Sequence, residues 1–153
     1  MAIDMKELNE FLATCGPNTK IYCGCDSGVF MKYGKPMVTY TVAVVVHIDG
    51  KHGGKLFYEN IVERDFSVSR NKPSPRLITE VHKVSELYLR MLNECDNCLD
   101  REIEIHLDFN PMEEHKSSAV IKEAIGYIQG VCQVTPKVKP EAWCASTIAD
   151  RFH

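Results

Sequence analysis

Long apolar runs are missing from this sequence of 153 residues. The longest, residues 42–46, has the length of a strand and falls far short of the roughly 20 residues that a membrane-spanning helix needs. Residues 1–7 are acidic, whereas a secretory signal peptide begins with basic residues and continues with apolar ones. These absences predict a cytoplasmic protein that does not associate with membranes.

An even, regularly spaced set of cysteines is also missing, and so is an excess of basic residues. The seven cysteines are an odd number and lie mostly within apolar patterns, which predicts buried free thiols in a reducing compartment. The net charge of -3 argues against a protein that coats nucleic acid by charge alone. Bound cations that neutralised a few carboxylates would leave the remainder slightly positive, so a nucleic-acid partner stays open.

The order of apolar patterns predicts one α/β domain over residues 1–153, without repeats or linkers. The expected strands cover residues 20–25, 37–48, 56–62, 102–109 and 131–135. The expected helices cover residues 4–14, 75–93, 117–129 and 141–153. A meander of strands followed by alternating helices and strands indicates a mixed sheet with helices on its faces.

Four carboxylates occupy positions where these elements could bring them together. Asp26 follows the first strand, where Asp before Ser-Gly is also typical of a turn. Glu80 falls inside the apolar arc of the helix over 75–93, and a carboxylate facing a sheet is costly unless it is paired or metal-bound. Asp108 ends the strand over 102–109, where ligands bind in open α/β sheets, although it also continues a polar edge. Asp150 lies on the last helix, where a solvated carboxylate is equally expected.

If the first and fourth strands are adjacent and parallel, Asp26 and Asp108 become neighbours. The two helices would then bring Glu80 and Asp150 to the same edge. Four oxygen ligands around one point suit Mg²⁺ or Mn²⁺ better than Zn²⁺ or copper. Two such ions could activate water and stabilise the leaving oxygen of a phosphodiester.

Short motifs around these positions carry a family resemblance over nearly the whole chain. The motifs are Cys25-Asp26-Ser27-Gly28, His106-Leu107-Asp108-Phe109-Asn110, Lys139-Pro140-Glu141-Ala142-Trp143 and Ala149-Asp150-Arg151. Together with the order of elements they resemble the ribonuclease H superfamily, and more narrowly the small YkuK-type ribonuclease H-like family of bacteria and phages.

The resemblance implies a five-stranded sheet in the order 3-2-1-4-5 and a two-metal nuclease site. By this analogy Asp26 would bridge two Mg²⁺ or Mn²⁺ ions, Glu80 and Asp108 would complete one of them, and Asp150 the other. The substrate would be a nucleic acid, with RNA or an RNA–DNA hybrid favoured. The alternative is a non-catalytic nucleic-acid-binding or adaptor protein on the same fold. The resemblance leaves the oligomeric state open.

Three other features have competing interpretations. Cys95 and Cys98 have the spacing of zinc ligands, but a single CxxC without a second pair is weak evidence for zinc. His106 is expected on the same strand face as Asp108, where it could tune a site or serve only as a strand histidine. Loop and helix-start cations could form a phosphate-binding rim, or could simply be solvated. These cations are Lys20, Arg70, Lys72, Arg76, Lys137 and Lys139.

Overall fold

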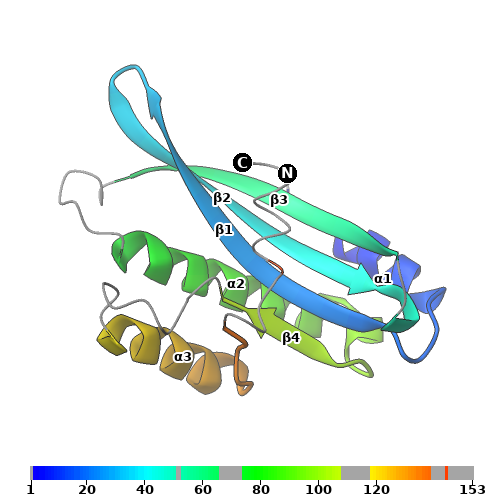
Figure 1. Ribbon diagram of the computed structural model, residues 1–153. Helices are drawn as coiled ribbons and strands as arrows, with labels where there is room; N and C mark the ends of the chain where they lie inside the picture. The colour runs from blue at the N-terminus through cyan, green and yellow to red at the C-terminus, as the bar shows by residue number, and fades with distance from the viewer. Residues whose placement is uncertain (1, 51–52, 66–73, 108–117, 139–143, 145–153) are drawn as a thin grey trace.

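The computed structural model describes residues 2–50, 53–65, 74–107, 118–138 and 144. Within these residues, four strands form one mixed sheet in the order β3-β2-β1-β4 (Figure 1). The strands are β1 (Lys20–Lys32), β2 (Lys35–His47), β3 (Gly54–Arg64) and β4 (Ile103–His106). The helices are α1 (Met5–Ala13), α2 (Ser74–Glu94) and α3 (Ser118–Cys132), with short 3-10 turns η1 (Ile48–Gly50) and η3 (Asp96–Cys98). The predicted α/β class is confirmed.

Strands β1 and β2 form a long antiparallel hairpin that extends well past the predicted end of the first strand. The pairing runs without interruption from Lys20 opposite His47 to Lys32 opposite Lys35. The prediction that β1 ends at Asp26 is therefore wrong. Each residue beyond Asp26 gains a backbone partner on β2, and this outweighs the local turn tendency of Asp-Ser-Gly. The actual turn is Tyr33-Gly34, where both residues have a positive φ, as two-residue hairpin turns require.

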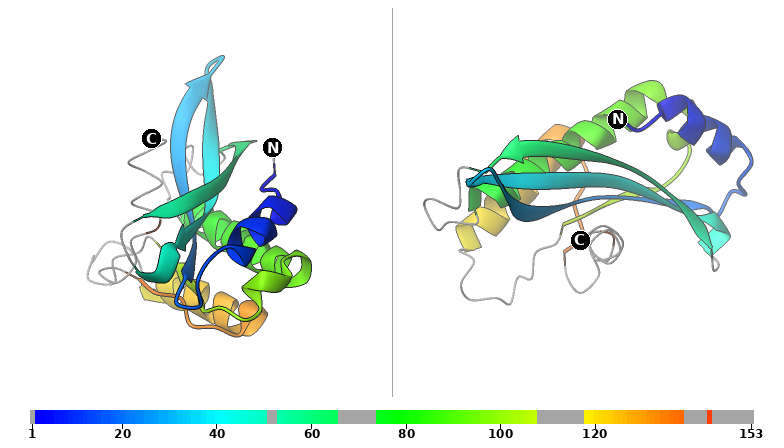
Figure 2. Two further views of the ribbon diagram at one scale, coloured as in Figure 1. Left: turned by 90° about the vertical axis from the view of Figure 1, so that its right-hand side faces the viewer. Right: turned by 90° about the horizontal axis from the view of Figure 1, so that it is seen from above.

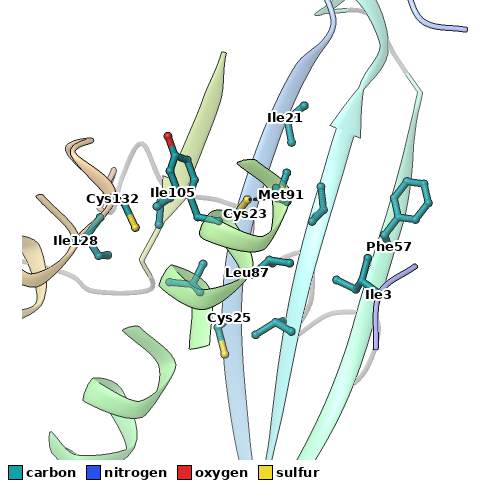
Figure 3. Packing of buried hydrophobic residues seen from close by; sticks show 14 of the residues in the cluster. Ile3, Ile21, Cys23, Cys25, Phe57, Leu87, Met91, Ile105, Ile128 and Cys132 are labelled. Atoms are coloured by element: carbon teal, nitrogen blue, oxygen red, sulfur yellow. Dashed lines mark hydrogen bonds between the residues drawn. The ribbon is translucent and has the colours of Figure 1, made fainter. Parts of the chain in front are cut away.

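The three helices cover one face of the sheet, and the main core lies between them and the strands (Figure 2). Alternate residues of β1 point into this core, so Ile21, Cys23 and Cys25 are buried against α2. Figure 3 shows Cys23 beside Met91 and Cys25 beside the same helix. The sequence prediction that the two thiols share one buried strand face is confirmed.

The opposite face of β1 carries Tyr22, Gly24 and Asp26. A smaller apolar cluster lies on this side, formed by Tyr22, Ala43 and Cys144 with the half-buried Val45 and Leu56. Cys144 is fully buried and lies about 120 residues along the chain from Tyr22. The carboxyl-terminal part of the chain therefore reaches the sheet on the face that α2 does not cover.

Helix α2 packs through the apolar arc that the sequence predicts. The residues of this arc are all buried: Leu77, Val81, Val84, Leu87, Tyr88 and Met91. Glu80 lies among them and is only 8% exposed, whereas Glu86 on the opposite side of the helix is exposed.

Among the described residues, none of the helices, α2 included, is long and apolar enough to cross a membrane.

The predicted strand over residues 131–135 is wrong, because α3 continues to Cys132. The buried residues Ile121, Ala124, Ile128 and Cys132 keep helical spacing to the end of α3. Gln133, with φ of 59°, then ends the helix. The part of the chain that the structure describes contains a single parallel bridge beyond β4, between His106 and Lys137. Most of the helix predicted over 141–153 lies outside the described residues.

All seven cysteines are free, and six of them are buried. Burial raises the pKa of the Cys23 and Cys25 thiols well above its ordinary value, and raises that of Cys144 to about 12. The absence of disulfides and the burial of these three cysteines, both predicted from sequence, are confirmed.

Thiol titration of the native protein near pH 8 should therefore detect Cys15 alone at early times, since only this cysteine is partly exposed. Denaturant should release all seven thiols. A denatured sample prepared under air that yields fewer than seven would reveal a disulfide and contradict this prediction.

Candidate functional site

Glu80 is held against β1 by a hydrogen bond from the strand. The Ser27 hydroxyl donates to Glu80 Oε2 over 2.7 Å. Ser27 belongs to the β1 face that α2 covers, and Glu80 lies one helical turn before Val84, which packs into the core. The bond fixes one carboxylate oxygen of a nearly buried side chain.

Asp26, the neighbour of Ser27, is half-buried and lies opposite Thr41 of β2. Strand alternation puts Asp26 on the face opposite Ser27. Thr41 is fully buried, and its hydroxyl donates to Asn60 Oδ1 of β3 over 2.6 Å. Asp26, Thr41 and Asn60 thus form a polar row across β1, β2 and β3.

The edge of β1 at Asp26 explains how side chains from two faces can approach one another. Parallel pairing with β4 covers Ile21 to Gly24 only, so Asp26 and Ser27 lie beyond its end. Among the described residues, β1 is paired on its β2 side alone from this point on. As far as the described residues go, this edge of β1 is left unpaired, and we consider it as the place where Asp26 and Glu80 could serve the same site.

The other two candidate carboxylates, Asp108 and Asp150, lie outside the described residues. The register nevertheless relates their sequence positions to the site. Gly24 pairs with His106, and Asp26 and Asp108 each follow two residues later. Asp150 follows Cys144 by six residues. The structure thus places Asp26 on β1 and bonds Glu80 of α2 to the adjacent Ser27, and the convergence of the four carboxylates stays a prediction.

The electrostatic surroundings of Glu80 are acidic. Cys25 has a raised pKa, mainly because it is buried, and the carboxylates of Glu80 and Asp26 raise it further. Burial is also the main cause of the raised pKa of Tyr40, and nearby carboxylates raise this pKa further. These carboxylates are Glu63, Glu80 and Asp65. Negative charge gathered at one place favours a bound cation.

Lys83 is the cation next to this region, and it is already engaged. Its ammonium lies 2.7 Å from Glu63 Oε2 and 5.1 Å from the centre of the Tyr40 ring. Lys83 also lowers the pKa of the Cys25 thiol, against the stronger effect of burial. The ion pair holds the Lys83 ammonium beside Glu63 of β3. There it offsets only part of the negative charge of the carboxylates near Tyr40.

His106 makes the contacts of a structural residue. It is 1% exposed, its ring lies 5.1 Å from that of Tyr22, and its Nδ1 accepts a hydrogen bond from the Cys144 amide over 3.3 Å. Its Nε2 lies 3.5 Å from Glu104 Oε1. Burial lowers the pKa of His106, while Glu104 acts in the opposite direction. A neutral imidazole that accepts at Nδ1 ties the segment at Cys144 to β4.

The CxxC pair does not form a zinc site with other described residues. Cys95 and Cys98 are both buried, with their sulfur atoms 2.8 Å apart. Within the described ranges, no group of three or more His, Cys, Asp or Glu side chains is arranged to hold a metal ion. The sulfur of Cys95 lies 3.6 Å from Asn9 Oδ1, and Asn97 also bonds to Asn9, so the pair packs against α1.

The predicted basic rim is wrong for Lys20. This residue begins β1, six residues before Asp26, and lies 3.8 Å from Glu102 at the amino end of β4. Six residues of strand span about 20 Å, which places Lys20 far from the candidate site. Lys137 lies beside His106, and Arg76 lies in the first turn of α2. Arg70, Lys72 and Lys139 lie outside the described residues.

Sequence reasoning missed the roles of Ser27, Thr41 and Asn60. The sequence favours a turn at Ser27, whereas in the extended strand its alternation with Cys25 places it on the α2 face. Thr41 is a polar residue within the apolar run of β2, a signal that this position meets something other than the core. Asn60 carried no comparable signal.

Comparisons with known proteins bear on this geometry. No curated protein and no solved structure matches the chain. A family model described as Ribonuclease H-like matches residues 5–153, which is nearly the whole sequence. The sheet order β3-β2-β1-β4, with β1 and β4 parallel, fits such a fold. The resemblance predicted from the motifs is thereby confirmed, and the chain belongs to the Ribonuclease H-like family.

Proposed function

We propose that the protein is a metal-dependent nuclease that hydrolyses phosphodiester bonds, with RNA or the RNA strand of a hybrid as substrate. The observation that carries the proposal is the placement of Glu80. A nearly buried glutamate reaches β1 from α2 and accepts a hydrogen bond from the residue next to Asp26. A carboxylate is costly to bury unless hydrogen bonds, an ion pair or a metal ion compensate it, and a bound cation would add to the hydrogen bond from Ser27.

The donor atoms at this edge suit a hard divalent cation. Asp26 and Glu80 offer carboxylate oxygens, and the hydrogen bond from Ser27 holds Glu80 Oε2 in place. The nearby Cys25 thiol has a pKa held high by burial, so it is neutral and a poor competitor as ligand. These features fit Mg²⁺ or Mn²⁺ and disfavour soft metals.

Asp108 and Asp150 would complete the set. Their support is the β1–β4 register, which sets Asp108 and Asp26 equally far beyond the last pair, and the hydrogen bond of the Cys144 segment to His106. When bound, the ions would supply an activated water and stabilise the negative charge that develops during cleavage. The residues of this chain hold the carboxylates in place: Ser27 orients Glu80, and the β2 ladder fixes Asp26.

A cleavage panel tests the proposal. Labelled single strands, duplexes, RNA–DNA hybrids and branched DNA are incubated with the protein and Mg²⁺, Mn²⁺ or EDTA. We expect cleavage of an RNA-containing substrate that requires the metal and disappears in Asp26→Asn. Asp100→Asn, an exposed carboxylate on a loop, is the matched control and should cleave normally.

Two outcomes would contradict the proposal. Cleavage that survives Asp26→Asn would remove this carboxylate from the site. Binding of nucleic acid without cleavage of any substrate under any metal condition would favour a non-catalytic adaptor instead.

A further inference from the structure

The hairpin of β1 and β2 projects beyond the rest of the sheet as a two-stranded arm (Figure 1). Pairing with β3 ends at Met37 opposite Arg64, and pairing with β4 ends at Gly24. Residues 29–36 at the end of this arm include several large exposed side chains. These are Val29, Phe30, Met31 and Tyr33, with Tyr33 93% exposed. These exposed side chains do not pack into a core, so their apolar character needs another explanation.

The two faces of the arm differ in charge. Strand alternation places Lys32 and Lys35 on the same face as Asp26, with Arg64 of β3 beside them opposite Met37. The outer part of this face extends from the row of Asp26, Thr41 and Asn60 to the turn at the end of the arm. Its described strand residues include three cations and no carboxylate besides Asp26. The other face carries Glu63, which Lys83 neutralises.

Lys32 and Lys35 face each other directly across the turn. Like charges in directly opposed strand positions destabilise a hairpin. Neither lysine forms an ion pair with a described residue; the ammonium of Lys32 lies over the Tyr33 ring at 6.0 Å. A polyanion bound on this face would relieve that repulsion.

The residues between the lysines and Asp26 suit an extended strand of nucleic acid. Every second residue from Lys32 back to Asp26 lies on the same face of β1. Phe30 and Gly28 are the two residues between them on the Asp26 face. Phe30 is 37% exposed and can stack on a base, while Gly28 has no side chain and allows the backbone of a ligand to approach. Lys32 and Asp26 are six residues apart, about 20 Å, which is the rise of about six nucleotides only when their bases are stacked as in a helix, and fewer when the strand is extended.

We infer that the Asp26 face of the β1–β2 arm binds a single-stranded segment of nucleic acid and leads it to the carboxylates at the edge of β1. Lys32 and Lys35 contact its phosphates, and Phe30 and Tyr33 stack on its bases. The choice of nucleic acid as the ligand rests on the proposed nuclease function. Binding to the arm can nevertheless be tested without measuring cleavage.

The test measures binding of fluorescein-labelled 15-nucleotide single-stranded RNA and DNA by anisotropy, in EDTA and at several salt concentrations. The variants are Lys32→Ala/Lys35→Ala and Phe30→Ala/Tyr33→Ala. The matched controls are Lys6→Ala/Lys122→Ala, which removes two exposed lysines elsewhere, and Tyr127→Ala on α3. All substituted side chains are at least partly exposed, and equal melting temperatures would establish that the variants fold.

We expect the lysine variant to bind about tenfold more weakly and its salt slope to fall by about 1.4, the contribution of two phosphate contacts to a single strand. The aromatic variant should lose about tenfold or more at every salt concentration without a change in slope. Both controls should bind as the parent does, and a blunt duplex should bind more weakly than the single strands.

Three results would overturn the inference: arm variants that bind as the controls do, a parent protein that binds neither single strand, or arm variants that change the sedimentation mass of the free protein instead. The last would identify the arm as a contact between copies of the chain. Binding that depends on the arm, without any cleavage, would support the inference and contradict the nuclease function. Cleavage that the arm variants leave unaffected would support the nuclease function and contradict the inference.

Discussion

Millimolar Mg²⁺ or Mn²⁺ should raise the melting temperature of the native protein and leave that of Asp26→Asn almost unchanged. The carboxylates proposed to gather at the edge of β1 would repel one another in the metal-free protein, and the carboxylates that raise the pKa values of Tyr40 and Cys25 show that negative charge is present nearby. A metal that binds only the folded arrangement stabilises it by about 2.7 kcal/mol at a hundred times its dissociation constant. For a chain of this size, that corresponds to a shift of about 5–10 °C.

The sign of the change in the metal-free variant is informative as well. Asp26→Asn removes one repulsive charge, so without metal the variant should be as stable as the parent or more so. The loss should appear only in the metal response. Asp100→Asn should keep the full metal-induced shift, because its side chain is exposed and precedes the amino end of β4, whereas Asp108 follows the carboxyl end of that strand. Equal metal-induced shifts in the parent and Asp26→Asn would remove Asp26 from the metal site.

Glu80→Gln should reduce the cleavage rate about 10²–10³-fold while the protein stays folded. The amide oxygen of Gln can still accept the hydrogen bond from Ser27, and the volume of the side chain is nearly the same. The substitution therefore removes the charge of a nearly buried carboxylate at almost constant volume. Its thermal stability should equal or exceed that of the parent, since a desolvated charge has been replaced by a neutral group.

Glu86→Gln is the matched control, because Glu86 lies on the exposed side of the same helix. It should cleave and melt as the parent does. The measurement is kcat and KM on the best substrate from the cleavage panel, together with a thermal melt. A strong loss of stability in Glu80→Gln with unchanged kcat would show that Glu80 serves the fold through Ser27 and has no part in the reaction.

The helical part of this architecture could be predicted from sequence because its signals are periodic. The arc of α2 identified the buried face and placed Glu80 inside it, and the structure confirms both. The strand assignments failed where local signals and long-range pairing disagree. Asp26-Ser27-Gly28 favours a turn locally, yet β2 offers each of these residues a partner. Residues 131–132 favour a strand by composition, yet the buried spacing of α3 continues through Cys132.

The candidate site divides in a similar way. Element order and burial predict Asp26 and Glu80; the structure shows Glu80 nearly buried and bonded to Ser27, the neighbour of Asp26, while their common role stays a prediction. The contribution of Ser27 depends on which face of β1 it occupies, and this follows from the true length of the strand. The arm could not be predicted either, because only the β1–β2 and β2–β3 registers show that Lys32, Lys35 and Arg64 share a face with Asp26.

The parallel pairing of β1 with β4 has a consequence for how the chain folds. Strands β1, β2 and β3 follow one another directly, so their contacts form between residues close in sequence. Ile21 meets Ile103 only after the roughly 80 intervening residues have closed into a loop, and contacts of such long range form slowly. Until then the apolar edge of β1 around Cys23 is open to other chains. The strand that supplies Asp26 is thus also the segment through which newly made chains are most exposed to aggregation.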